Sequence, residues 1–226
     1  QHADLETLRA TIDALEEDLP PKAVKLGMLG TAAIIREVAS FVGRFDGPVV
    51  CDPVMVTTSG ARLLDEEAAA ELLQLIAHCS LITPNHFEAE ALVGRHLSTP
   101  ADVERAAAEL VDLGCGAVLI KGGHAPPSSA AGVAQDYYFD GTAGVWLTCE
   151  RIQSAETHGT GCTLSSAAAS LLAHGYPMLD AVVLAKAYVT QGIRHATRLG
   201  SGPGPVAHTG FPREEGARPC ASPTAA

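Results

Sequence analysis

The segment 157–162, with the sequence THGTGC, has the residue types and spacing that best suit chemistry in this chain. It leads into a helix predicted over residues 161–174. Two glycines let successive backbone N–H groups converge, and the helix N-terminus adds about half a positive charge. This favours an anion hole for a phosphate or a phosphoryl group in transfer. An ordinary glycine-rich turn before a helix explains the same pattern, so both interpretations stay open.

Cys162 falls in the first turn of that predicted helix. The dipole that attracts an anion there also favours a thiolate. A thiolate facing a site would serve as a proton acceptor or as an activated thiol. The alternative is a small buried apolar residue, a common role for a free cysteine.

Two carboxylates follow neighbouring predicted strands. Asp52 ends the strand at 48–51, and Glu88 comes soon after the strand at 80–83. Such a pair can hold Mg²⁺, usually through water, with phosphates completing the octahedron. The alternative is structural, with an aspartate as a cap and a glutamate in a first turn, favoured by the helix dipole.

Lys121 ends the strand predicted at 117–121 and precedes Gly122 and Gly123. A lysine at this position can reach a phosphate as a point charge. The two glycines let a ligand approach the backbone closely. The alternative is a solvated loop lysine.

Two further features are weaker. The small polar segment at 57–61, after the strand of Asp52, is interpreted as a mobile flap over the site or as a plain loop. His86, His124 and His158 are expected to be loop residues rather than catalysts.

Strands alternate with helices along the chain, and the strands are short and apolar without alternation, which is typical of strands covered on both faces. Asp140-Gly141 between residues 135–139 and 145–149 predicts an antiparallel hairpin. We therefore predict an α/β three-layer sandwich, with a mostly parallel central sheet flanked by helices and an antiparallel edge hairpin. It forms one domain over residues 1–212, followed by a disordered tail over 213–226. The predicted strands are 23–27, 48–51, 80–83 and 117–121 with the hairpin, and the predicted helices are 3–18, 31–45, 65–78, 87–93, 99–113, 161–174 and 177–199.

Composition excludes several classes of function. The chain has 226 residues, 47% of them hydrophobic, and a formal net charge of −11. This charge repels phosphate backbones, so we expect no nucleic acid partner. No apolar run is long enough for a membrane span, and no signal peptide pattern opens the chain. The six cysteines form no C-x-x-C pair, which favours reduced thiols and a cytoplasmic location.

Five blocks of sequence, in this order, resemble the hydroxymethylpyrimidine/phosphomethylpyrimidine kinases of thiamine biosynthesis, within the ribokinase-like superfamily. Their joint order and spacing are far more specific than any one block, and the resemblance covers about residues 1–212. The stretch GPVAH at 204–208 also fits the family's C-terminal region. The blocks are VKLGML at 24–29, CDPVMV at 51–56 with SG at 59–60, ITPN at 82–85 with EAE at 88–90, LIKGGH at 119–124 and HGTGCT at 158–163.

The resemblance implies roles for residues at the matching positions. Cys162 takes the place that most sugar kinases of the superfamily fill with a base aspartate. The other implied assignments are an anion hole at Gly159, Thr160 and Gly161; contacts to ATP from Lys121, Asn85, Thr157 and Gly122; magnesium at Asp52 and Glu88; and a pyrimidine pocket with Gly27, Met28 and Val54.

The resemblance also implies the reaction. ATP, with Mg²⁺, would phosphorylate 4-amino-5-hydroxymethyl-2-methylpyrimidine and then convert its monophosphate to the diphosphate, in a homodimeric enzyme. A neutral hydroxymethyl group benefits from a base as it attacks, whereas a monophosphate is already anionic near pH 7. We therefore expect Cys162 to matter more in the first step. The alternatives are a pyridoxal kinase, a relative that usually keeps aspartate at this position, and a truncated, non-catalytic nucleotide-binding module.

The start of the chain raises a separate expectation. Members of the family begin with a strand, a glycine-rich segment, a helix and a second strand ahead of the block at 24–29. The helix predicted here over 3–18 follows no strand, although a crossover helix normally does. We therefore expect the kinase domain at 1–212 to be incomplete at its N-terminus, and the unpaired strand to favour association.

Overall fold

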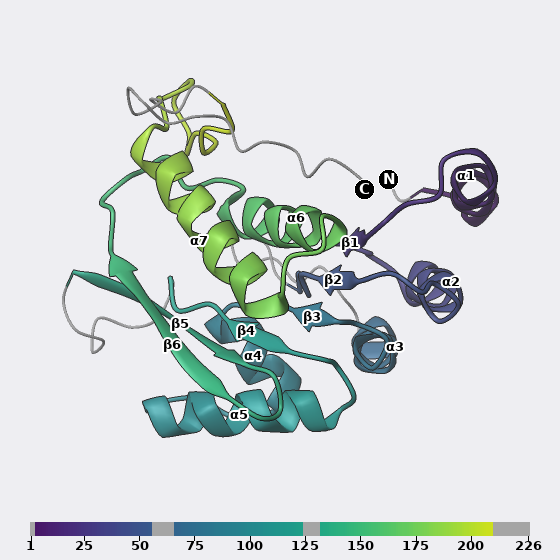
Figure 1. The fold of residues 1–226 in the computed structure, drawn as a ribbon, viewed down its shortest axis with the longest axis horizontal. Helices are drawn as coiled ribbons and strands as arrows, with labels where there is room; N and C mark the ends of the chain where they lie inside the picture. Colours follow the sequence, from purple (N-terminus) through teal and green to yellow (C-terminus); the bar gives the residue numbers. More distant parts are fainter. Residues whose placement is uncertain (1–2, 56–65, 124–131, 210–226) are drawn as a thin grey trace, which may run out of the picture.

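The computed structural model describes residues 3–55, 66–123 and 132–209. Six strands form one sheet in the order β1 to β6 (Figure 1). The first four pair in parallel, and β5 is antiparallel to both β4 and β6. The predicted mostly parallel sheet with an antiparallel edge hairpin is thus confirmed. The strands are β1 (Val24–Leu26), β2 (Val49–Cys51), β3 (Leu81–Ile82), β4 (Val118–Ile120), β5 (Val133–Phe139) and β6 (Gly144–Glu150).

The helices within the described ranges occur in the predicted order, with small shifts at their ends. The last of them ends at Arg194 rather than at Leu199. The chain after it turns back along the helix, and the N–H of Ala207 donates to the carbonyl of Gly192 at 3.0 Å. The helices are α1 (Leu5–Asp18), α2 (Ala32–Val42), α3 (Glu66–Ile76), α4 (His86–Val93), α5 (Pro100–Asp112), α6 (Thr160–Ala173) and α7 (Met178–Arg194).

The sheet lies between two helical layers, because successive strand residues point to opposite faces. Val49 and Cys51 belong to a core shared with α2, α3 and α5. Val50, between them, belongs to a second core shared with α6 and α7. All three residues are almost completely buried, which explains why the strand carries no polar alternation. Figure 1 shows α6 and α7 together on one side of the sheet.

The hairpin turn is longer than the predicted Asp140-Gly141 pair. The strands end at Phe139 and restart at Gly144, and the carboxylate of Asp140 accepts from the backbone N–H groups of Thr142 (2.9 Å) and Ala143 (2.8 Å). An aspartate that caps its own turn in this way stabilises a four-residue loop.

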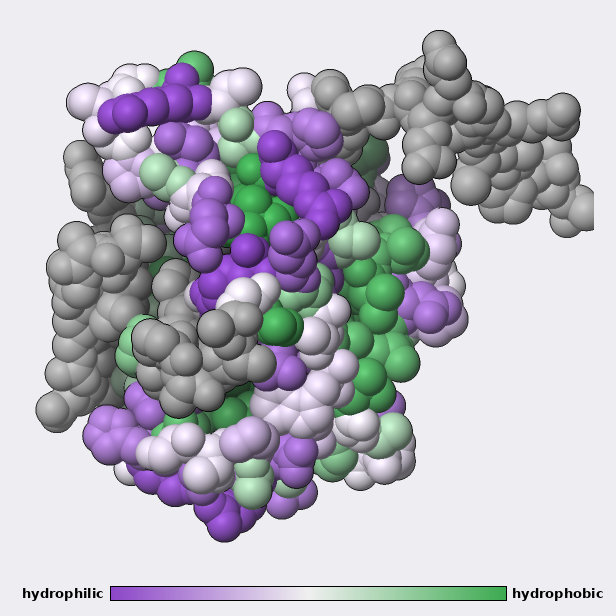
Figure 2. All heavy atoms as spheres, turned by 90° about the vertical axis from the view of Figure 1, so that its left-hand side faces the viewer, coloured by the Kyte–Doolittle hydropathy of each residue, from purple (hydrophilic) through white to green (hydrophobic). Residues whose placement is uncertain are grey.

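The surface combines charged and apolar regions. Figure 2 shows a continuous band of hydrophobic residues down one side of the molecule, beside strongly hydrophilic residues. None of the helices in the described ranges combines the length and the apolar run that crossing a bilayer demands. The large hydrophobic side chains that are exposed in the described ranges include Leu15, Leu19, Met28, Phe87, Leu113, Tyr176, Val183, Leu184 and Leu199.

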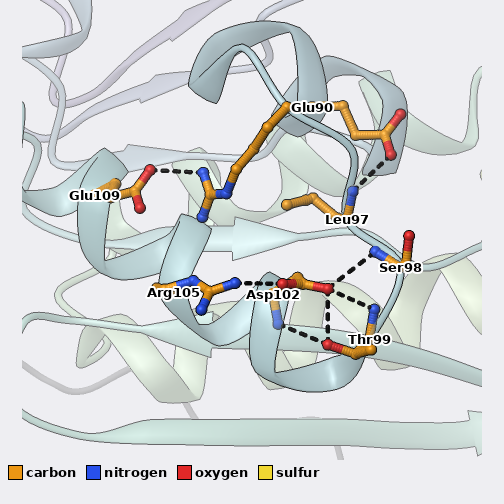
Figure 3. A network of polar contacts seen from close by, with 8 residues as sticks. Glu90, Leu97, Ser98, Thr99, Asp102, Arg105 and Glu109 are labelled. Atoms are coloured by element: carbon orange, nitrogen blue, oxygen red, sulfur yellow. Dashed lines mark hydrogen bonds and ion pairs between the residues drawn. The ribbon is translucent and has the colours of Figure 1, made fainter.

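Carboxylates hold the connection between α4 and α5 (Figure 3). Glu90 accepts from the backbone N–H of Leu97 at 2.8 Å. Thr99 caps α5, and its side chain and that of Asp102 satisfy each other's backbone N–H groups. These bonds fix the chain where it enters α5.

Several predictions fall outside the described residues. They are the flap at 57–61, the first residue of the helix predicted over 65–78, the loop residue His124 and the tail over 213–226.

Candidate active site

Parallel pairing brings the carboxyl ends of the first four strands to one edge of the sheet. The N–H of Asp52, just after β2, donates to the carbonyl of Leu26 in β1 at 2.9 Å. The N–H of Lys121, just after β4, donates to the carbonyl of Pro84 at 2.8 Å, and Lys121 forms a parallel bridge with Asn85. The strand-end residues predicted as functional therefore lie side by side.

Asp52 and Lys121 form an ion pair at this edge. Lys121 Nζ lies 2.7 Å from Asp52 Oδ1, and the hydroxyl of Thr83 donates to the same oxygen at 3.2 Å. The Asp52 side chain is 3% exposed and that of Lys121 is 14% exposed. The interpretation of Lys121 as a solvated loop residue is therefore wrong, because its side chain is buried against that of Asp52.

Gly161 meets this ion pair at the start of α6. A Cβ atom built on Gly161 would lie 3.1 Å from Lys121 Nζ and 3.4 Å from Asp52 Oδ2. The backbone of the glycine-rich segment thus lies directly against the charged ends of both side chains. Any side chain at position 161 would crowd the lysine.

The glycine-rich segment forms the N-terminus of α6 itself. Gly159 is the N-cap residue with φ of +82°, a conformation that favours glycine. The N–H of Thr160 donates to the carbonyl of Thr157 at 3.4 Å, whereas Gly161 and Cys162 fall in the first turn, where N–H groups have no helical acceptor. The amides available to an anion therefore come from Gly161 and Cys162 rather than from Thr160.

Cys162 is exposed, so the alternative of a small buried apolar residue is wrong. It lines a cavity of about 800 Å³ along α6 and α7, with Gly159, Ser166, Leu184 and Tyr188 among its other lining residues. The thiol is therefore accessible from solvent, next to the first-turn amides.

Glu88 is buried, and its carboxylate accepts from the N–H of Asn85 at 2.8 Å, while the Asn85 side chain accepts from the N–H of Glu88 at 2.9 Å. This capping box matches the structural alternative for Glu88. Burial raises the pKa of Glu88, the charge of Lys121 opposes the rise, and the charge of Asp52 adds to it. The charges of Lys121 and Asp52 therefore act on Glu88. Among the described residues, no hydrogen bond or ion pair joins Glu88 to either of them.

The residues predicted to line the pyrimidine pocket follow the first two parallel strands. Gly27 and Met28 follow β1, and Val54 follows β2, with its N–H donating to the carbonyl of Asp52 at 2.8 Å. Met28 is 57% exposed, and Val54 is half-buried. These residues therefore follow the paired ends of β1 and β2, as Asp52 does.

The sequence analysis missed a second buried ion pair. Lys186 Nζ in α7 lies 2.5 Å from Asp136 Oδ2 in β5, and both side chains are nearly buried. Asp136 Oδ1 accepts from the N–H of Gly122 at 2.9 Å, and a Cβ on Gly122 would overlap the carbonyl oxygen of Gln135. The signal was a charged residue inside each of two apolar segments. The pair holds the backbone next to Lys121.

Comparisons with known proteins identify the family. A family model described as phosphomethylpyrimidine kinase matches residues 1–207. The chain belongs to the phosphomethylpyrimidine kinase family. The family named from the five sequence blocks is therefore confirmed.

Individual members of this family and its structural relatives are similar over most of the chain. A hydroxymethylpyrimidine/phosphomethylpyrimidine kinase of Synechococcus elongatus is 43% identical, over 88% of this chain and 75% of its own length. One from Bacillus subtilis is 41% identical, over 92% of this chain and 77% of its own. A structure of pyridoxal kinase from Staphylococcus aureus with AMP-PCP and pyridoxal is 30% identical, with a TM-score of 0.82, over 91% of this chain and 74% of its own. The predicted ribokinase-like kinase fold is thus confirmed.

Proposed function

We propose that this chain uses ATP to phosphorylate 4-amino-5-hydroxymethyl-2-methylpyrimidine, and then its monophosphate to the diphosphate; relatives named hydroxymethylpyrimidine/phosphomethylpyrimidine kinase support this. The observation that carries the proposal is the position of Gly161, where an added Cβ atom would lie within 3.4 Å of charged atoms of both Lys121 and Asp52. First-turn amides and an ammonium group that face the same point are suited to bind the γ-phosphoryl group and the charge it develops in transfer.

In this proposal each group at the α6 N-terminus has a role. The amides of Gly161 and Cys162 and the ammonium of Lys121 receive the phosphoryl oxygens. In this proposal the sulfur of Cys162, exposed beside those amides, accepts the proton of the substrate hydroxyl in its thiolate form and becomes a thiol. Asn85, Thr157 and Gly122 contact the nucleotide in this proposal.

The carboxylates fit a magnesium ion bound with the nucleotide. Asp52 Oδ1 accepts hydrogen bonds from Lys121 and Thr83, while Oδ2 lies near Gly161. Glu88 uses one oxygen in its capping box and lies near the same charges. Mg²⁺ commonly takes one or two carboxylates and completes its shell with water and phosphate oxygens. When bound, the ion would neutralise charge on the β- and γ-phosphates.

The pyrimidine is proposed to bind beside Gly27, Met28 and Val54. These residues follow β1 and β2, the strands next to Asp52 along the sheet edge. An exposed methionine and a half-buried valine offer apolar contact to a flat ring. We also propose that the active form is a homodimer.

A second candidate function is a pyridoxal kinase activity, because a structural relative 30% identical to this chain was solved with pyridoxal. The test is a direct comparison. The purified chain is given ATP and Mg²⁺ with the hydroxymethylpyrimidine, its monophosphate or pyridoxal, and kcat/KM is measured for each.

We expect both pyrimidines to be phosphorylated and pyridoxal to be at least tenfold poorer by kcat/KM. A preference for pyridoxal would replace the first proposal by the second. Binding of Mg-ATP without turnover of any of the three would indicate a nucleotide-binding module.

A further inference from the structure

The segment at 204–207 is bonded to the loop that leads into α6. The N–H of His158 donates to the carbonyl of Gly204 at 3.1 Å, and the N–H of Val206 donates to the carbonyl of His158 at 3.3 Å. His158 and Pro205 form a parallel bridge. These bonds fix the backbone immediately before Gly159, the residue at which α6 begins.

Glu156 adds a side-chain bond to the same contact. The residue is 8% exposed, and its carboxylate Oε2 accepts from the N–H of Gly204. A Cβ atom on Gly204 would overlap that carboxylate oxygen. A side chain at position 204 would therefore displace the Glu156 carboxylate from the N–H of Gly204. A carboxylate buried against a backbone N–H makes a strong, charge-assisted hydrogen bond.

The segment is in turn fixed to α7. Val206 is 2% exposed, and the N–H of Ala207 donates to the carbonyl of Gly192. A Cβ on Gly192 would lie 2.7 Å from the carbonyl oxygen of Ala207, so the two backbones approach as closely as they can. Residues 204–207 therefore connect the packed helix α7 to the loop at 156–158.

We propose that Glu156 is a positioning residue for phosphoryl transfer, and that its bond to Gly204 sets the orientation of the amides at the α6 N-terminus. The inference rests on the proposed function, because those amides are the ones assigned to the transferred group. Glu156 lies five residues before Gly161. None of the contacts found among the described residues joins it to the ion pair of Lys121 and Asp52. It acts through the loop. Catalytic groups need placement within about half an ångström, and a displacement of about 1 Å costs about 100-fold in rate.

Three variants and one control test this. Glu156→Ala removes the acceptor, and Glu156→Gln keeps an oxygen that can accept from Gly204. Gly204→Ala disturbs the contact from the other side. Glu90→Ala is the matched control, because Glu90 also binds a backbone N–H, that of Leu97, but in the connection between α4 and α5 (Figure 3).

We expect Glu156→Ala to lower kcat by about tenfold to 100-fold and to weaken Mg-ATP binding in calorimetry about tenfold. The KM for the pyrimidine should stay within twofold, because that pocket is built on other strands. Glu156→Gln should recover most of the kcat and of the binding. Glu90→Ala should lower the melting temperature while leaving kcat within twofold.

The pair Glu156→Ala and Gly204→Ala should be less than additive, because removing the carboxylate makes room for the new methyl group. Additive losses, or a folded Glu156→Ala chain with the kcat and ATP affinity of the wild type, would overturn the proposal. A wild-type chain without turnover would instead contradict the proposed function. The calorimetric comparison then decides on Glu156 by itself, and equal affinities for Mg-ATP would reject its role.

Discussion

At the scale of single residues, Cys162 differs from the buried thiols of the described chain. Cys51, Cys79 and Cys115 are buried, and burial raises the pKa of Cys115 to about 11. The Cys115 thiol therefore stays protonated near neutral pH, and the buried cysteines serve as small apolar residues. Cys162 is instead exposed in the first turn of α6, which is why the proposed function assigns it the proton of the substrate hydroxyl.

Substituting this thiol should separate the two phosphorylation steps. We expect Cys162→Ala to lower kcat for the hydroxymethylpyrimidine by about 100-fold or more, which is the usual contribution of a general base. The kcat for the monophosphate should fall by less than about tenfold, since its attacking oxygen is already anionic near pH 7. Steady-state rates with each substrate measure this. Cys149→Ala, in β6, is the control. Equal losses in both steps would exclude the base role.

Glu88 should give the stability of the chain a pH dependence. Burial raises its pKa in the folded chain above the ordinary value of 4.5. Between 4.5 and the raised pKa, the folded chain holds this proton and the unfolded chain has lost it, so the Glu88 contribution to unfolding free energy falls as the pH rises.

Glu88→Gln removes this contribution and keeps an oxygen for the N–H of Asn85. We expect the stability of the variant, relative to wild type, to increase as the pH rises from 4.5 to 7. Urea unfolding in the presence of a chelator, at a series of pH values, measures the difference. A difference that is constant with pH would show that the carboxyl pKa is the same in the folded and unfolded chains.

At the scale of elements, the buried pair of Lys186 and Asp136 links α7, β5 and the end of β4. Lys186 neutralises Asp136, and Asp136 holds the N–H of Gly122, next to Lys121. A helix on one face of the sheet thus fixes the backbone at a strand end. This connection positions Lys121, as does the bond of Lys121 to Asp52.

Removing one partner of this ion pair should lower the unfolding free energy, and replacing the other partner as well should restore most of it. Lys186→Met leaves a buried carboxylate without its cation, which we expect to cost about 3–5 kcal/mol of unfolding free energy. Adding Asp136→Asn should recover most of this loss, because the amide oxygen still accepts from Gly122 without a charge. Urea unfolding of both variants measures the recovery. A double variant no more stable than Lys186→Met would mean that the ion pair itself, and not the isolated charge, decides the stability.

The elements of the site could be predicted from the sequence, but several of its contacts could not. Short apolar strands followed by Asp52, Asn85 and Lys121 predicted that these residues share one sheet edge, because parallel strands end together. The bond between Asp52 and Lys121 spans 69 positions, and the bond between Glu156 and Gly204 spans 48. No local periodicity reports on partners so far apart in the chain.

At the scale of the whole molecule, the net charge of −11 repels the anionic ATP. Binding of ATP therefore depends on hydrogen-bond donors and positive charges close to its phosphates. We therefore expect Mg-ATP to stabilise the fold, by about 2.7 kcal/mol at 100 times its dissociation constant. Asp52→Ala should lose most of this effect, because Lys121 then loses the partner that holds it against Gly161. Thermal unfolding with and without Mg-ATP measures it. Equal stabilisation of both chains would place the nucleotide elsewhere.

The sequence by itself determined the alternation of strands and helices, the glycine-rich start of α6 and the family, because these depend on hydrophobic pattern and on motifs with fixed spacing. Only the tertiary structure decided which alternatives hold. It buried Lys121 against Asp52, left Cys162 exposed, and turned the Thr160 amide toward Thr157. Burial and pairing arise from packing between segments distant in the chain, and residue type alone does not specify them.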